Sequence, residues 1–234
     1  MPTAAILTIG NELTSGDVAN TNASWLARRL ERVGLRVTML AAVPDEIETI
    51  ARFIRREAAD ADVVVVTGGL GGTPEDITRE AVAAAFGVGQ ETVPELADAL
   101  RARFTHDPEY AAAWAELPAG SSALENPLGG APGFAIDNVY VLPGLPAEME
   151  AMFETIADRL AGAPPIGAWR RTYHTRESEI VGVLVAASES FPGVRIGSYP
   201  TFGEGGSRVE IVLKSSDERQ LAAAASYVSS ALDT

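Results

Sequence analysis

Residues 63–78 read Val63-Val-Val-Val-Thr67-Gly68-Gly-Leu-Gly-Gly72-Thr-Pro-Glu-Asp-Ile-Thr78, and this stretch decides the fold class. The four valines form a continuous apolar run, as expected of a strand that is buried on both faces of a parallel sheet. Thr73 and Pro74 predict the start of a helix that continues to residue 86. A strand, a glycine loop and a helix in this order predict one unit of an α/β fold.

The loop in this stretch carries four glycines within five positions. Bare backbone N–H groups beside a helix N-terminus attract anions, and glycine allows a phosphate to approach the backbone closely. Glu75 and Asp76 follow the loop, and a carboxylate beside a phosphate needs a cation between the two groups. The loop therefore predicts a metal-bridged phosphate. The alternative is a turn without a ligand, in which Asp76 only favours the helix dipole. The loop matches neither nucleotide motif, G-x-G-x-x-G or the P-loop.

Working outward, three strand–loop–helix units follow one another, which predicts a parallel sheet with helices on both faces. We expect strands at residues 4–10, 35–43 and 63–67, and helices at 21–33, 44–60 and 74–86. Residues 93–114 read as mainly helical, 117–133 as a loop, 134–142 as a hairpin and 147–160 as a helix. The prediction for residues 1–165 is a three-layer α/β/α domain with a mostly parallel sheet.

A second domain is predicted beyond the Gly- and Pro-rich residues 162–167. Its expected order is a strand at 169–175, a helix at 177–190, strands at 194–199 and 208–214, and a helix at 217–232. This order predicts a small α+β domain over residues 168–234.

Composition narrows the classes of function. The 234 residues include no cysteine and two histidines, so disulfides, thiolate metal sites and a cysteine nucleophile are excluded. The net charge of −14 argues against nucleic acid or an anionic membrane as a partner. No apolar run approaches membrane-spanning length, and residues 1–9 read as a first strand, so we expect a cytoplasmic protein. One lysine and 32 acids make adaptation to high salt a hypothesis.

Polar or glycine-rich loops follow four of the expected strands. Open α/β sheets bind ligands at the carboxyl ends of their strands, so we expect these loops to meet there. Each loop also has an ordinary explanation: Asn20 or Thr21 as a helix N-cap, Asp45 with Glu48 as a capping box, and Pro143-Gly144 as a turn. The candidate ligand-binding residues are Gly10, Asn11, Ser15, Gly16, Asn22, Gly68, Gly69, Gly71, Gly72, Thr73, Thr78, Pro143, Gly144 and Pro146.

Several of these segments together resemble the N-terminal part of the CinA proteins (competence/damage-inducible protein A). The segments are residues 10–16, 20–22, 67–78, 126–134, 142–149 and 196–200. The resemblance implies a MoaB/Mog-type molybdopterin-binding domain followed by a small KH-type domain, and a dimer or trimer. It also implies a nucleotide or pterin as the ligand, molybdopterin among them, and hydrolysis of ADP-ribose or a similar dinucleotide pyrophosphate with Mg²⁺, Mn²⁺ or Co²⁺.

The chain departs from the family pattern at two positions. Asn20 stands where the family usually has an aspartate, and Gly72 stands where proline is usual. The chain ends without the deamidase domain that many CinA proteins carry, so we expect no deamidase activity.

The expected mechanism places a phosphate on the amides of the glycine loop. Asp76, with Asp45 or Glu12, would provide the catalytic carboxylates, and Asp76 and Asp45 would hold the metal. Three classes stay open: a metal-dependent pyrophosphohydrolase, a protein that binds or adenylylates molybdopterin, and a non-catalytic binding or assembly module.

Overall fold

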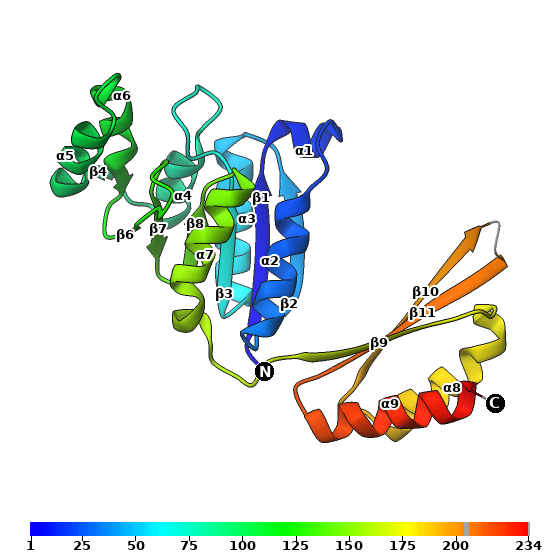
Figure 1. The fold of residues 1–234 in the computed structure, drawn as a ribbon. Helices are drawn as coiled ribbons and strands as arrows, with labels where there is room; N and C mark the ends of the chain where they lie inside the picture. Colours follow the sequence, from blue (N-terminus) through cyan, green and yellow to red (C-terminus); the bar gives the residue numbers. More distant parts are fainter. Residues whose placement is uncertain (204–205, 234) are drawn as a thin grey trace. The chain divides into compact units, whose positions relative to one another are not determined.

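A six-stranded sheet with the order β2-β1-β3-β8-β7-β6 organises the first of two units in the computed structural model (Figure 1). The structure describes residues 1–203 and 206–233, and it divides the chain into Met1–Ala163 and Pro164–Thr234. The strands β2, β1, β3 and β8 are parallel to one another, whereas β7 is antiparallel to both of its neighbours, β8 and β6. The predicted fold class, a mostly parallel sheet in an α/β unit, is confirmed.

The strands of this sheet are β1 (Thr3–Ile9), β2 (Arg36–Val43), β3 (Val63–Thr67), β6 (Ser122–Leu124), β7 (Gly133–Ile136) and β8 (Val139–Leu142). The helices of the unit are α1 (Asn11–Ser15), α2 (Thr21–Arg32), α3 (Ile47–Asp60), α4 (Thr78–Phe86), α5 (Pro94–Arg103), α6 (Pro108–Ala112) and α7 (Pro146–Leu160).

Helices cover both faces of the sheet, because its central strands are apolar on both sides. Figure 1 shows α2 and α7 on one face and α3 and α4 on the other. On β3, Val64 and Val66 pack in the core beside α3 and α4, while Val65 packs with α2 and α7. The alternation of side chains along a strand thus divides one valine run between two cores. This double burial explains why the run could be recognised as a central strand.

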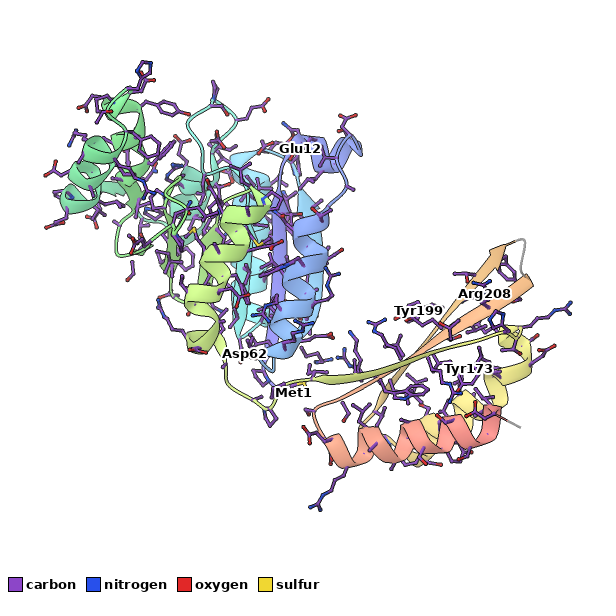
Figure 2. The ribbon with its side chains drawn as sticks, in the orientation of Figure 1. Met1, Glu12, Asp62, Tyr173, Tyr199 and Arg208 are labelled. Atoms are coloured by element: carbon purple, nitrogen blue, oxygen red, sulfur yellow. The ribbon has the colours of Figure 1, made fainter. Side chains whose placement is uncertain are left out.

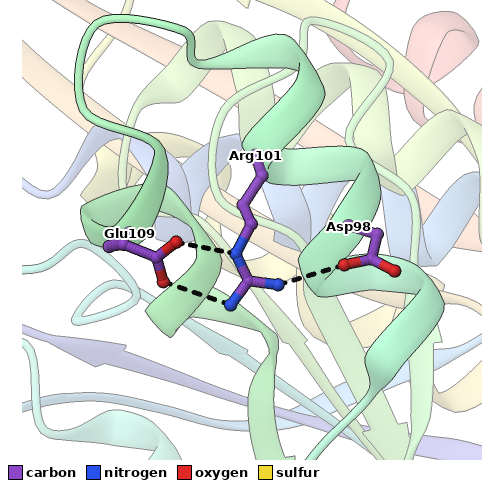
Figure 3. A network of polar contacts seen from close by, with 3 residues as sticks. All are labelled: Asp98, Arg101 and Glu109. Carbon is purple, nitrogen blue, oxygen red and sulfur yellow. Dashed lines mark hydrogen bonds and ion pairs between the residues drawn. The ribbon is translucent and has the colours of Figure 1, made fainter.

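The same unit also contains a small lobe, formed by α5, α6, the 3₁₀ turn η1 (Ala113–Ala115) and the two-stranded sheet of β4 (Gln90–Thr92) and β5 (Glu116–Pro118). Arg101 links its two helices, as Figure 3 shows. The Arg101 guanidinium donates to Glu109 at 2.9 and 3.1 Å and to Asp98 at 3.1 Å. All three side chains are exposed, so the link orients α5 against α6 but adds little stability.

The second unit has three antiparallel strands and two helices, as predicted. Its sheet has the order β10-β11-β9, formed by β9 (Gly167–Tyr173), β10 (Arg195–Gly203) and β11 (Gly206–Ser215). The helices α8 (Glu177–Ser190) and α9 (Glu218–Leu232) pack on one face through Ile180, Leu184, Ala224 and Val228. In Figure 2, Tyr199 and Arg208 mark the strands of this sheet.

Three sequence-based boundaries are wrong. The helix expected from Pro74 begins at Thr78, because the backbone of residues 73–77 forms a turn that Asp76 closes by accepting from Thr73. Asp45 caps no helix, since α3 begins at Ile47 and lacks a side-chain cap. The loop expected at residues 117–133 contains β6, which pairs with β7.

None of the helices in residues 1–203 and 206–233 has both the length and the apolar character that a membrane span requires.

Candidate functional site

The carboxyl ends of β1, β3 and β8 meet around two glycines. A Cβ atom on Gly144, which follows β8, would lie 3.3 Å from the Cα of Gly68, which follows β3. A cavity of about 130 Å³ lies on one side of this contact and includes Glu12, Asn22 and Pro146 in its lining. A second cavity of about 280 Å³, on the other side, is lined by Gly69, Gly71, Asp76 and Pro143 among others. Gly144 lines both cavities, so the cavities adjoin at the contact between Gly68 and Gly144, which we call the ridge.

The carbonyl groups of residues 68–71 in the glycine loop accept hydrogen bonds from the first two residues of α4. Thr78 donates its hydroxyl to the Gly68 oxygen at 2.9 Å and its amide to the Gly69 oxygen at 3.2 Å. Arg79 donates to the Leu70 oxygen at 2.7 Å and to the Gly71 oxygen at 3.3 Å. Thr78 and Arg79 therefore hold four successive carbonyl groups towards α4.

The amide groups of residues 69–72 in the same loop are unpaired among the described residues. Within the described part of the chain, the N–H groups of Gly69, Leu70, Gly71 and Gly72 donate to no other residue. Backbone N–H groups that are grouped in this way form an anion site. The long helices α2 and α7 also begin at the smaller cavity, at Thr21 and Pro146, and their N-termini add positive potential.

Arg79 adds a full positive charge beneath the loop. It is 7% exposed, and its Nε atom has no hydrogen-bond partner among the described residues. Burial lowers the pKa of Arg79, and the carboxylates of Asp76 and Glu116 oppose that change. Arginine remains protonated in proteins, so the charge stays in place.

Acidic side chains gather beside this positive region. The Asp45 carboxylate accepts from the Asn11 amide at 2.7 Å, and the Asn11 side chain accepts from the Asp45 amide at 3.2 Å. Burial raises the pKa of Asp45, and the charges of Glu12, Glu75 and Asp76 raise it further against the Asn11 hydrogen bond. These acids are therefore close enough to repel one another, as a cation site requires.

The carboxylates fit a metal that arrives with its phosphate ligand. No cluster of three or more histidine or acidic residues is preformed as a metal site in residues 1–203 and 206–233. Mg²⁺ is usually held by one or two carboxylates together with substrate phosphates and water, so a complete protein cage is not needed. Of the two acids expected to hold a metal, Asp76 lines the larger cavity and Asp45 lines neither, although the charge of Asp76 contributes to the raised pKa of Asp45.

The remaining predicted positions divide into three groups. Glu12, Asn22, Gly68, Gly69, Gly71, Asp76, Pro143, Gly144 and Pro146 line the cavities. Gly10, Asn11 and Asp45 lie at the end of β1 and β2, where Gly10 donates its amide to Val43 at 3.1 Å. Ser15, Gly16, Gly72 and Thr73 line neither cavity.

Two of these predictions need correction. Thr78 is fully buried with its hydroxyl bonded to Gly68, so it shapes the loop and cannot contact a ligand. Ser15 donates to Asp17 at 2.6 Å behind the short helix α1, because the turn after that helix directs it away from the cavities.

At the two positions that depart from the family pattern, the neighbouring residues suit the residue that this chain has, Asn20 or Gly72. Asn20 is the N-cap of α2, where its oxygen accepts from the Ala23 amide at 3.1 Å and its amide donates to the Thr8 hydroxyl at 2.7 Å. An ionised aspartate at this position could accept from the Ala23 amide but could not donate to Thr8. At Gly72, a Cβ would lie 2.5 Å from the ring of Tyr110, so glycine and tyrosine are accommodated together.

Three site residues were not predicted from the sequence. Arg79 lies among residues that are typical of a helix, and its position in the sequence pattern does not indicate that its side chain is buried. Glu148 lines the larger cavity, and Asn126 donates to it at 2.9 Å. Asn126 is buried, although it lies in a segment rich in glycine and proline that is typical of a surface loop.

Comparison with known proteins agrees with this geometry. Residues 5–162 match the family model described as "Probable molybdopterin binding domain", and residues 172–234 match the model "FAD synthase, middle domain". The expected KH type of the second unit is not confirmed by the latter match and stays a prediction.

Individual relatives cover most of the chain. A protein of Archaeoglobus fulgidus is 37% identical over 205 residues, covering 85% of this chain and 86% of the relative. A CinA-like protein of Frankia casuarinae is 38% identical over 93% of this chain, but the match spans only 55% of that longer relative. The crystal structure of CinA from Thermoplasma acidophilum, described as having unknown function, is 30% identical. It covers 68% of this chain and 98% of its own, with a TM-score of 0.64.

Proposed function

Since the chain belongs to the molybdopterin-binding domain family, and within it to the CinA-like proteins, we propose that its first unit is a metal-dependent pyrophosphohydrolase. The proposed substrate is ADP-ribose or a related dinucleotide such as FAD, and the proposed metal is Mg²⁺, Mn²⁺ or Co²⁺. The proposal includes a homo-oligomer as the working form.

One observation carries this proposal: the glycine loop turns its carbonyls towards Thr78 and Arg79 and leaves four amides open. A carbonyl that pointed into the cavity would repel a phosphate oxygen, whereas an open amide donates to it. The buried charge of Arg79 strengthens the same preference. The loop thus favours an anion over a neutral ligand.

The ridge between the cavities supports a pyrophosphate as the anion. Gly68 and Gly144 carry no side chains, so a linear group can cross from the cavity beside Glu12 to the cavity beside Asp76. The two halves of a dinucleotide would then occupy the two sides. Asn22 helps to fix the position of Gly144, since it donates to the Gly144 oxygen at 2.8 Å.

The residues of the chain have defined parts in the proposed reaction. The loop amides would hold the non-bridging phosphate oxygens, and Asp76 and Asp45 would hold the cation. When bound, a divalent cation neutralises phosphate charge and lowers the pKa of a coordinated water. Water adds to one phosphorus, the bridging P–O bond breaks, and ADP-ribose yields AMP and ribose 5-phosphate.

The first test measures AMP release from ADP-ribose, FAD and NAD with each of the three metals in high KCl. We expect release that depends on metal and is lost in Asp76→Asn. The matched control is Asp60→Asn, which makes the same charge change at the exposed end of α3, before β3 begins. Turnover by Asp76→Asn at the wild-type rate would contradict the assigned role.

Molybdopterin binding is the second candidate, and the family match favours it. Pterin phosphates would use the same loop amides. A folded protein without turnover on any dinucleotide, but with saturable binding of a pterin phosphate, would replace the first proposal with this one. If neither ligand binds, the chain is a non-catalytic module.

A further inference from the structure

A third cavity, of about 430 Å³, lies between α5 and the edge of the main sheet. From α5 and the residue before it, Val93, Leu96, Ala99 and Leu100 line one wall. The opposite wall includes Ala123, Leu124 and Glu125 at β6, the last strand of the sheet. Its volume falls in the range of small-molecule sites. None of the residues named so far as binding phosphate or metal belongs to it.

The cavity runs along the edge of β6 and does not lie over one of its faces. Successive side chains of a strand point to opposite faces, so a cavity lined by residues 123, 124 and 125 has to meet the strand edge-on. Among the described residues, β6 pairs only with β7, and its second edge carries no partner strand. An edge strand offers alternating N–H and C=O groups in the plane of the sheet.

The chemistry of the two walls favours a flat aromatic ring as the ligand. Leu96, Leu100 and Pro132 supply apolar surface, and the β6 backbone supplies donors and acceptors in one line. A purine or a pterin has this character, since its faces are apolar and its rim alternates ring nitrogens with exocyclic donors or acceptors. An aliphatic chain would leave the strand edge unpaired, and a sugar would place hydroxyl groups against leucine.

The cavity adjoins the glycine-loop site at one short segment. Gly130 lines both this cavity and the one beside Asp76. Asn126 lines the third cavity and donates to Glu148, which lines the second. A Cβ on Gly130 would lie 2.3 Å from the Glu148 carboxylate, so no side chain fits at this position unless that carboxylate moves.

We propose that this α5–β6 cavity binds the nitrogen heterocycle of the ligand whose phosphates lie on the glycine loop. The inference rests on the proposed phosphate site, but it does not require hydrolysis. Arg103 reaches over Gly129 at the mouth of the cavity, because a Cβ on that glycine would lie 1.5 Å from its guanidinium. Arginine stacks on flat heterocycles, so Arg103 is placed to cover the ring.

The test fills the cavity and measures binding by calorimetry, with AMP, ADP-ribose, a free pterin and inorganic pyrophosphate as probes. Ala99→Trp places an indole in the cavity from an exposed position of α5. Ala102→Trp adds the same group to the same helix outside the cavity lining and is the matched control. Ala99→Leu serves as a milder variant if tryptophan disturbs the fold, which circular dichroism detects.

We expect Ala99→Trp to weaken the binding of the ring-bearing probe at least tenfold and to leave pyrophosphate affinity unchanged. The Ala102→Trp control should bind both as wild type does. Loss of AMP binding assigns the cavity to a purine, and loss of pterin binding assigns it to a pterin. Wild-type affinity for every ring-bearing probe in Ala99→Trp, or no ring binding in the wild-type protein, overturns the proposal. Absent turnover with intact ring binding would remove only the hydrolase function.

Discussion

Arg79 donates a 2.7 Å hydrogen bond to the carbonyl oxygen of Leu70 from a position that is 7% exposed. This bond fixes the direction of the glycine loop, since it turns a carbonyl away from the cavities. The same guanidinium reaches the Gly71 oxygen at 3.3 Å.

Replacing this arginine should affect stability and anion binding together. Arg79→Met keeps the volume but leaves two buried carbonyl groups without a donor, which costs about 2–4 kcal/mol of unfolding free energy. Pyrophosphate affinity should fall as well, and Arg79→Lys should restore part of both. Urea denaturation and calorimetry measure the two effects. Full affinity in a destabilised Arg79→Met protein would show that the loop keeps its direction without the guanidinium.

Gly68 should tolerate no side chain. Its φ is +108°, and a Cβ there would lie 2.3 Å from the Ile9 carbonyl oxygen at the end of β1. Gly87 is the matched control, because its φ is +67° and a Cβ there would meet nothing within 4 Å. We expect Gly87→Ala to cost about 1–2 kcal/mol from backbone strain alone, and Gly68→Ala to cost clearly more. Equal destabilisation of the two variants in urea would contradict the close contact with Ile9.

The contribution of the Asp45 carboxyl group to the free energy of unfolding should fall as the pH rises. Its pKa is raised in the folded protein, so the folded state binds a proton more readily than the unfolded state. This contribution to stability is complete below the ordinary aspartate pKa of 3.8 and is lost as the pH rises through the higher folded pKa.

Because asparagine does not ionise, the Asp45→Asn variant does not lose stability in this way as the pH rises. Its side-chain oxygen can still accept from the Asn11 amide. The melting temperature of the variant relative to wild type should therefore increase as the pH rises from below the ordinary aspartate pKa of 3.8 through the higher folded pKa. Melting curves of the two proteins that stay parallel over this range would exclude the effect.

Salt should stabilise the first unit more than the second. Residues 1–163 hold 24 of the 32 acidic and 11 of the 18 basic side chains, which leaves 8 and 7 for residues 164–234. Screening shortens the range of self-repulsion from about 10 Å at 0.1 M to about 3 Å at 1 M salt. Calorimetric melting in rising KCl should move the transition of the first unit upward, and no movement would reject the high-salt hypothesis.

The sequence predicted the sheet because its strands carry strong local signals. Val63–Thr67 is apolar throughout, and the loops after β1, β2, β3 and β8 contain the glycines and polar residues that the site uses. The helix start was wrong because Thr73 and Asp76 are typical of an N-cap but bond to each other in a turn instead. Burial of Arg79 depends on neighbours that are distant in the sequence, such as Glu116, so no local pattern could show it.

The contact between Gly68 and Gly144 also sets an order of events in folding. Thr67 donates to the Pro143 oxygen at 2.6 Å, across 76 residues of chain, where β3 and β8 pair, so this bond forms only after residue 143 has been synthesised. The two walls of the site are therefore joined only after nearly the whole first unit has been synthesised. A ligand that spans them binds the native state alone, so it should protect this unit from proteolysis in proportion to its concentration.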